Sequence, residues 1–169
     1  MADAEFVPTW IHGEGTSLAV DDAHFPVVIA TWLGRADSTV ADALAAFLEA
    51  QLDRAAVEGA RLICIHDALL AGRPRPSMRE TWEGVTDRLS KRAGELGTFN
   101  IIIVDNPLVR AAMTAALFFA NARRRTRVTD TRAKAIDMAL RRLEEQGTNR
   151  PMGLHPDRYQ PPEFSAAAV

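Results

Sequence analysis

Short apolar runs alternate along this chain with longer stretches of helical period. Residues 17–33 predict two strands around the polar turn Asp21-Asp22-Ala23-His24. The continuously apolar run 62–65 predicts a central strand, and His66-Asp67 is expected to mark its carboxyl end. Residues 99–104 predict a second buried strand, and residues 126–129 a last short one.

The stretches between these strands carry helix signals. From residue 38 to 58 the apolar positions fall on one helical face, with Asp37 or Ser38 as the N-cap and Gly59 as a left-handed C-cap. Ser77 and Glu80 have the spacing of a capping box and predict a helix that continues to about residue 96. Two further helices are expected, one over about 108–123 that begins at Asp105-Asn106-Pro107 and one over 131–146.

The predicted order is therefore β-β-α-β-α-β-α-β-α. Right-handed crossovers between buried strands give an α/β fold, a mostly parallel sheet with an antiparallel N-terminal hairpin at its edge and helices packed on it. We expect an N-terminal arm over 1–15, one domain over 16–146 and an extended tail over 147–169, which holds four of the nine prolines. The apolar residues of the tail are expected to fold back over the domain.

Composition narrows the class of protein. A length of 169 residues, 47% hydrophobic content and a net charge of −2 are typical of one globular domain. Because the chain has a single cysteine, no secretory signal pattern and no long apolar span, a reducing, cytoplasmic location without membrane insertion is expected. The four histidines lack zinc-site spacing, so neither a metal nor a cofactor is predicted.

Charge is uneven along the chain. Residues 1–60 carry ten acids and two bases, whereas residues 61–169 carry twelve acids and eighteen bases. The simplest interpretation is that complementary faces of one fold neutralise each other, and the alternative is head-to-tail self-association or a homodimer. Nucleic-acid binding is disfavoured, since the arginines at 123–125 and 127 have no interleaved aromatic residues.

The segment after the first central strand carries most of the candidate chemistry. Three arginines surround a serine in a proline-rich loop that leads into a helix. Ligands and partners usually meet an α/β sheet at its carboxyl edge, so a contact surface is expected there. Its candidate residues are Asp67, Arg73, Arg75, Ser77, Arg79 and Trp82. A phosphate on Ser77 would lie among arginines at a helix start, which makes this serine a candidate phosphorylation site.

Two other functions use the same fold. Ser77, His66 and Asp67 could meet at the top of the sheet as a hydrolase triad, although no Gly-x-Ser-x-Gly motif surrounds the serine. Alternatively, a small apolar or lipid-like ligand could lie between the sheet and the alanine-rich third helix. Cys64 lies within a buried strand, where a thiol behaves as a small hydrophobe, so it is not assigned a catalytic role.

The element order and several local features resemble the STAS domain, the SpoIIAA-like fold of anti-sigma-factor antagonists, over about residues 16–146. The matching parts are the hairpin ending in Trp32-Leu33-Gly34-Arg35, the long helix to Gly59, the runs 62–67 and 99–104, and the closing unit from Arg127. The family's regulatory Ser or Thr turn is replaced here by Asp67-Ala68-Leu69-Leu70-Ala71-Gly72. The resemblance implies a non-enzymatic regulatory or scaffolding module that binds a protein partner through this loop and the second helix.

Overall fold

The computed structural model describes residues 7–73, 75–94, 97–119 and 125–164. Its strands form one six-stranded sheet in the spatial order β1-β2-β3-β4-β5-β6. The strands are β1 (Thr9–Gly13), β2 (Thr16–Asp21), β3 (Val27–Gly34), β4 (Leu62–Ala71), β5 (Thr98–Ile103) and β6 (Thr126–Thr129). The first three strands pair antiparallel and the last four pair parallel, so the predicted α/β class and mixed sheet are confirmed.

Strand β1 lies within residues 1–15, the segment that the sequence analysis assigned to an N-terminal arm without predicting a strand there. Its residues pair antiparallel with β2, from Thr9 opposite Val20 to Gly13 opposite Thr16. The sequence does carry a hairpin signal, the two-residue connection Glu14-Gly15, in which Gly15 has φ +71°. The antiparallel edge of the sheet thus has three strands, and the observed order begins β-β-β-α.

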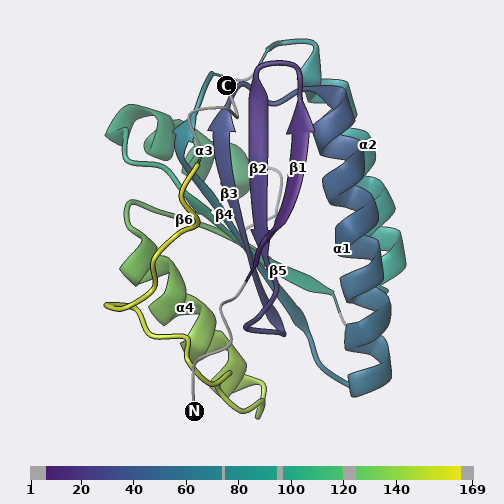
Figure 1. Ribbon diagram of the computed structural model, residues 1–169, viewed down its shortest axis with the longest axis vertical. Coiled ribbons are helices and arrows are strands. Elements are labelled where there is room, and N and C mark those ends of the chain that lie inside the picture. The colour runs from purple at the N-terminus through teal and green to yellow at the C-terminus, as the bar shows by residue number, and fades with distance from the viewer. Residues whose placement is uncertain (1–6, 74, 95–96, 120–124, 165–169) are drawn as a thin grey trace.

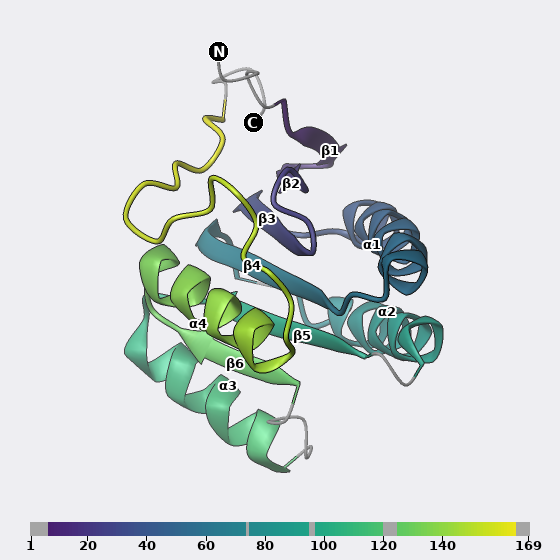
Figure 2. The same ribbon diagram turned by 90° about the horizontal axis from the view of Figure 1, so that it is seen from below.

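The described residues contain four helices. They are α1 (Ser38–Glu58), α2 (Met78–Ala93), α3 (Pro107–Phe119) and α4 (Arg132–Glu145). Helices α1 and α2 lie side by side on one face, whereas α4 covers the other face over β4 and β5 (Figures 1 and 2). Helix α3 lies next to β6, on the side opposite α4 (Figure 2). The last residues of the helices predicted over 77–96 and about 108–123 lie outside the described ranges.

Strand alternation divides the apolar residues of the sheet between two cores. Val28 and Cys64 point toward α1, and the neighbouring Ile29 and Ile65 point toward α4. All four are at most 2% exposed. Because both faces of β3 and β4 are covered, these strands are nearly continuous apolar runs, as parallel interior strands usually are. The adjacency of β4 and β5, on which the expected rim of the sheet depends, is confirmed.

One aspartate fixes both the start of α1 and the β1–β2 turn. Asp37 caps the helix by accepting a 2.9 Å hydrogen bond from the amide of Val40. Its other carboxylate oxygen accepts a 2.7 Å hydrogen bond from the amide of Glu14. A Cβ atom at Gly13 would lie 2.2 Å from the Asp37 carboxylate, so this turn can approach the cap only because residue 13 is glycine.

Residues 147–164 run along the same face of the sheet as α4, beside that helix (Figure 2). Leu154 is 2% exposed and packs with Tyr159 against the core beneath α4. Further along, the rings of Phe164 and Trp10 meet edge to face at 5.2 Å. Met152, by contrast, is 94% exposed. The described part of this segment, 147–164, contains no helix or strand.

Candidate functional site

The candidate site lies at the carboxyl edge of the parallel strands, where β3 and β4 end together. The amide of Gly72, just after β4, donates a 2.7 Å hydrogen bond to the carbonyl of Gly34 at the end of β3. This bond places Arg35 beside the start of the loop that carries Arg73 and Arg75. All three arginines are exposed, and Leu70 next to them is 53% exposed. We call Arg35, Leu70, Arg73, Arg75, Ser77 and Arg79 the carboxyl rim.

The start of α2 differs from the predicted capping box. Ser77 has helical backbone angles, φ −62° and ψ −19°, and its side chain makes no capping hydrogen bond. Main-chain carbonyls satisfy the first amides instead: Met78 donates to Arg75 at 3.0 Å and Arg79 donates to Pro76 at 3.2 Å. The turn formed before the helix therefore replaces the cap, and the Ser77 hydroxyl lies exposed on the rim.

Arg79 and Trp82 extend from the first turns of α2. The Arg79 guanidinium forms a 2.8 Å ion pair with Glu83 one turn along, and both side chains are largely exposed. Trp82 is half-buried and meets the ring of Trp32 edge to face, with centroids 5.6 Å apart. Trp82 thus holds α2 against the core, and only part of its ring is available to a partner.

Asp67 does not lie on the contact surface, which corrects the sequence-based assignment. Strand β4 does not end at His66-Asp67 but continues to Ala71, so Asp67 is an interior residue paired with Thr31 and Ile103. Its side chain is 1% exposed and forms an ion pair with Arg132 at the start of α4. Its other oxygen accepts a 3.2 Å hydrogen bond from the amide of Leu69. This carboxylate therefore joins helix to sheet.

The same strand separates the members of the expected triad. Adjacent strand residues point to opposite faces, so Asp67 lies on the α4 side and His66 on the α1 and α2 side. The two side chains therefore do not form a His-Asp pair. Burial lowers the pKa of His66 to about 4, while a side-chain hydrogen bond with Asn100 acts in the opposite sense. Burial likewise raises the pKa of the Cys64 thiol to about 12, so this sulfur is a poor nucleophile.

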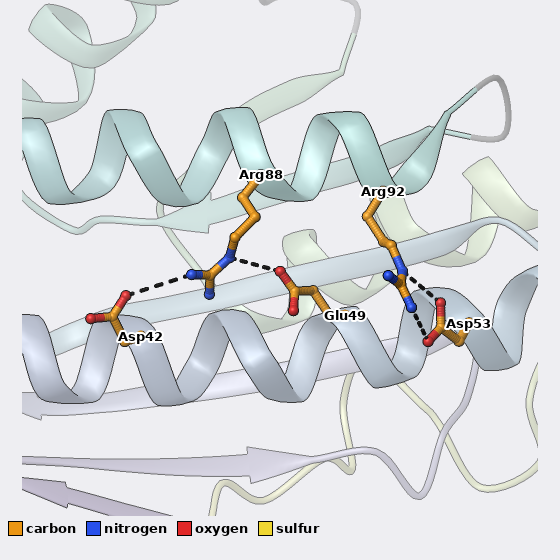
Figure 3. Close-up of polar contacts among 5 residues, drawn as sticks. All are labelled: Asp42, Glu49, Asp53, Arg88 and Arg92. Carbon is orange, nitrogen blue, oxygen red and sulfur yellow. Dashed lines mark hydrogen bonds and ion pairs between the residues drawn. The ribbon is translucent and has the colours of Figure 1, made fainter.

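The remaining arginines of α2 are used within the molecule (Figure 3). Arg88 lies 2.7 Å from Glu49 and 3.9 Å from Asp42, and Arg92 makes a bidentate contact with Asp53 at 2.6 and 2.8 Å. The acids belong to α1 and the arginines to α2. Part of the charge asymmetry is thus neutralised by ion pairs within one chain.

The described residues also bear on metal binding and membrane insertion. Within the ranges that the structure describes, no three His, Cys, Asp or Glu side chains are grouped so that they could hold a metal ion. No described helix combines the length and the apolar content that crossing a membrane would need. Of the basic cluster near residue 125, positions 123 and 124 lie outside the described ranges.

Neither a scan of protein-family models nor a search of curated proteins finds a match to this chain.

Arg35 and Leu70 are site residues that the sequence analysis missed. A signal for Arg35 was present, since it follows a predicted strand whose carboxyl end reaches the same edge of the sheet as the Arg73 loop. Leu70 had no such signal, because the strand was expected to end before it.

Proposed function

We propose that this chain is a non-enzymatic, STAS-like protein-interaction module with a regulatory or scaffolding role. The observation that carries the proposal is the carboxyl rim, where exposed arginines from two connections follow the joined ends of β3 and β4 and where Leu70, near the end of β4, is 53% exposed. No ion pair in the described part of the chain involves Arg35, Arg73 or Arg75. The order of strands and helices along the chain also supports the proposal, because it resembles the order in the STAS domain.

The rim fits an acidic partner segment with an apolar side chain. Guanidinium groups bind carboxylates in bidentate geometry, and arginine is enriched at the centres of protein interfaces. Leu70 supplies the apolar contact, and the exposed edge of Trp82 lies on the helix that follows. The Arg79 guanidinium can also bind a carboxylate of the partner in place of Glu83, since the side chains of both Arg79 and Glu83 are exposed.

A matched pair of double variants tests this proposal. Arg73→Glu/Arg75→Glu reverses two charges on the rim, and Arg61→Glu/Arg158→Glu reverses two exposed charges elsewhere. Affinity capture from the native host, followed by titration of the captured protein, is expected to show at least a tenfold loss of affinity for the rim variant alone. Unchanged binding by the rim variant, or equal losses in both variants, would rule out this surface.

We also propose Ser77 as the position where phosphorylation would alter the rim. The hydroxyl is exposed and lies next to the Arg73 and Arg75 loop. A phosphate there would compete with an acidic partner for the arginines. Ser77→Asp should weaken binding in the titration above, whereas Ser77→Ala should leave it unchanged. Equal binding by both variants would exclude this role.

A second candidate function is the carriage of a small apolar ligand between the sheet and α3. The observation that favours it is that Ile102 and its register partner Val128, which lie on the face of the sheet opposite α4, are only partly buried, as is Val104 just beyond β5. Sheet residues beneath a closely packed helix are normally buried, as those beneath α1 are. Native mass spectrometry of the purified chain tests this function. A retained apolar ligand would support it, and the bare mass alone would overturn it.

A further inference from the structure

The C-terminal segment 149–164 lies on a face of the sheet that carries buried polar side chains as well as apolar ones. It runs beside α4 and packs on the core cluster that contains Ile29 (Figure 2). Asp21 is the register partner of Ile29, and Thr31 follows Ile29 by two positions, so both point to this face. Asp21 is 3% exposed and Thr31 is 1% exposed. The segment therefore closes over polar groups that water does not reach.

Side chains, and not main-chain hydrogen bonds, hold this segment in place. The ring of Tyr159 meets the ring of His24 edge to face, with centroids 6.2 Å apart. A Cβ atom at Gly153 would lie 3.6 Å from the other side of the contact, the His24 ring. Among the described residues, no main-chain hydrogen bond joins 149–164 to a strand. The segment can therefore leave the sheet without disturbing the strand pairing.

The closed contact satisfies its polar groups poorly. His24 Nδ1 and Thr31 Oγ1 are buried and have no hydrogen-bond partner. The Asp21 carboxylate accepts a 3.0 Å hydrogen bond from the amide of Ala23, but in the described part of the chain it forms no ion pair. A buried carboxylate without a cation loses hydration that nothing replaces. Closure of the segment therefore disfavours the charged form of Asp21.

The groups around Asp21 do not reverse this effect. Burial raises the pKa of Asp21 above its ordinary value. The other groups that act on this carboxyl are, in its own turn, the Ala23 amide, Asp22 and His24 and, in the C-terminal segment, the Tyr159 hydroxyl. From the neighbouring elements, Asp67 of β4 and Arg132 of α4 act on Tyr159. An acid whose pKa is higher in the closed state takes up a proton on closing, so closure is favoured at low pH and is lost as the pH rises.

We infer that residues 149–164 form a strap whose closure over β2 and β3 is coupled to the uptake of a proton by Asp21. In the closed state the neutral carboxyl can donate a hydrogen bond to the neighbouring Tyr159 hydroxyl. In the open state water hydrates the carboxylate. The strap opens as the pH rises, and its opening uncovers the polar groups of the two strands. It includes none of the rim residues, so the inference is independent of the proposed function.

Hydrogen exchange of the full chain between pH 4.5 and pH 7.5, followed by mass spectrometry, tests the strap. The amides of Arg158 and Tyr159 donate to the carbonyl of His155 at 3.2 and 3.1 Å, so they report on the closed segment. Their exchange, divided by the rate of the unstructured peptide at each pH, should rise at least about threefold across this range, since one proton changes an equilibrium by up to about tenfold per pH unit. A peptide from β4 reports unfolding of the whole domain. No rise in the strap, or an equal rise in β4, overturns the inference.

Three variants identify the group that takes up the proton. Asp21→Asn keeps an oxygen that can accept from the Ala23 amide but cannot titrate, so its strap should open equally at every pH. Asp22→Asn is the matched control, because this neighbouring acid accepts a 2.8 Å hydrogen bond from Gln51, and it should keep the wild-type response. His24→Gln should keep the response as well. A wild-type response in Asp21→Asn, or its loss in Asp22→Asn or His24→Gln, overturns the assignment to Asp21.

Discussion

Asp67 and Arg132 form an ion pair across the interface between the sheet and α4, and their burial is unequal. The Asp67 side chain is 1% exposed, whereas that of Arg132 is 31% exposed. Arg132 is the first residue of α4, and Asp67 lies in the middle of β4. The pair thus fixes the start of the last helix on the sheet, and its two members lose different amounts of hydration on folding.

We expect removal of the arginine to cost more than neutralisation of the acid. Arg132→Ala leaves a buried carboxylate without its cation and should lower the free energy of unfolding by about 3 kcal/mol. Asp67→Asn leaves an arginine that water can still reach, and the amide oxygen can still accept from Leu69, so its cost should be about 1 to 2 kcal/mol. Denaturant unfolding measures both values. Equal costs would contradict the role of unequal burial.

His66 should make stability depend on pH. Burial holds its folded pKa at about 4, below the ordinary value of 6.5, so the unfolded chain binds a proton first as the pH falls. The contribution is present above pH 6.5 and is lost as the pH falls toward 4, by about 3 kcal/mol. His66→Gln removes this titration, so its unfolding free energy should change less over the same window. Identical pH profiles for the two proteins would contradict the assignment.

Leu154 should contribute to stability although it follows the last helix. Because its side chain is 2% exposed against the α4 core, Leu154→Ala should destabilise the protein by about 2 to 4 kcal/mol. Met152→Ala is the control, since Met152 is 94% exposed and its truncation should change stability by less than about 0.5 kcal/mol. Thermal and urea unfolding provide the comparison. A neutral Leu154→Ala would mean that this segment does not stabilise the core.

The ion pairs between α1 and α2 should contribute weakly and lose their effect in salt. Arg92 and Asp53 make a bidentate contact, yet both side chains are 54% exposed. Asp53→Ala should therefore cost only a fraction of what Arg132→Ala costs, and the cost should shrink as ionic strength rises. Unfolding at low and high salt measures the difference. A large loss that salt does not reduce would contradict surface screening of this pair.

The elements that the sequence predicted correctly carry strong local signals. The helix over 38–58 has apolar spacing, an aspartate cap and a terminal glycine that agree, and the structure gives α1 these bounds. The runs at 62 and 99 are apolar enough to require burial on both faces. Strand β1 was missed because an edge strand buries little, so its five residues show a weak pattern.

The candidate site was predicted only in part. The loop with Arg73 and Arg75 was found because a basic, proline-rich segment between a strand and a helix is visible in the sequence itself. Asp67 was misplaced because the position at which β4 ends depends on its pairing with β3 and β5. In the sequence alone, polar residues inside a strand look the same as polar residues that follow the end of a strand. The partner that permits its burial, Arg132, is 65 positions away.

The sequence by itself determined the alternation of strands and helices, the cap and stop of α1, and the presence of a basic loop, because these depend on neighbours within a few residues. Only the tertiary structure decided which polar groups are buried and which arginines are already paired. Burial and pairing depend on contacts between residues far apart in the chain, and these contacts exist only once the sheet has formed and the helices have packed on it.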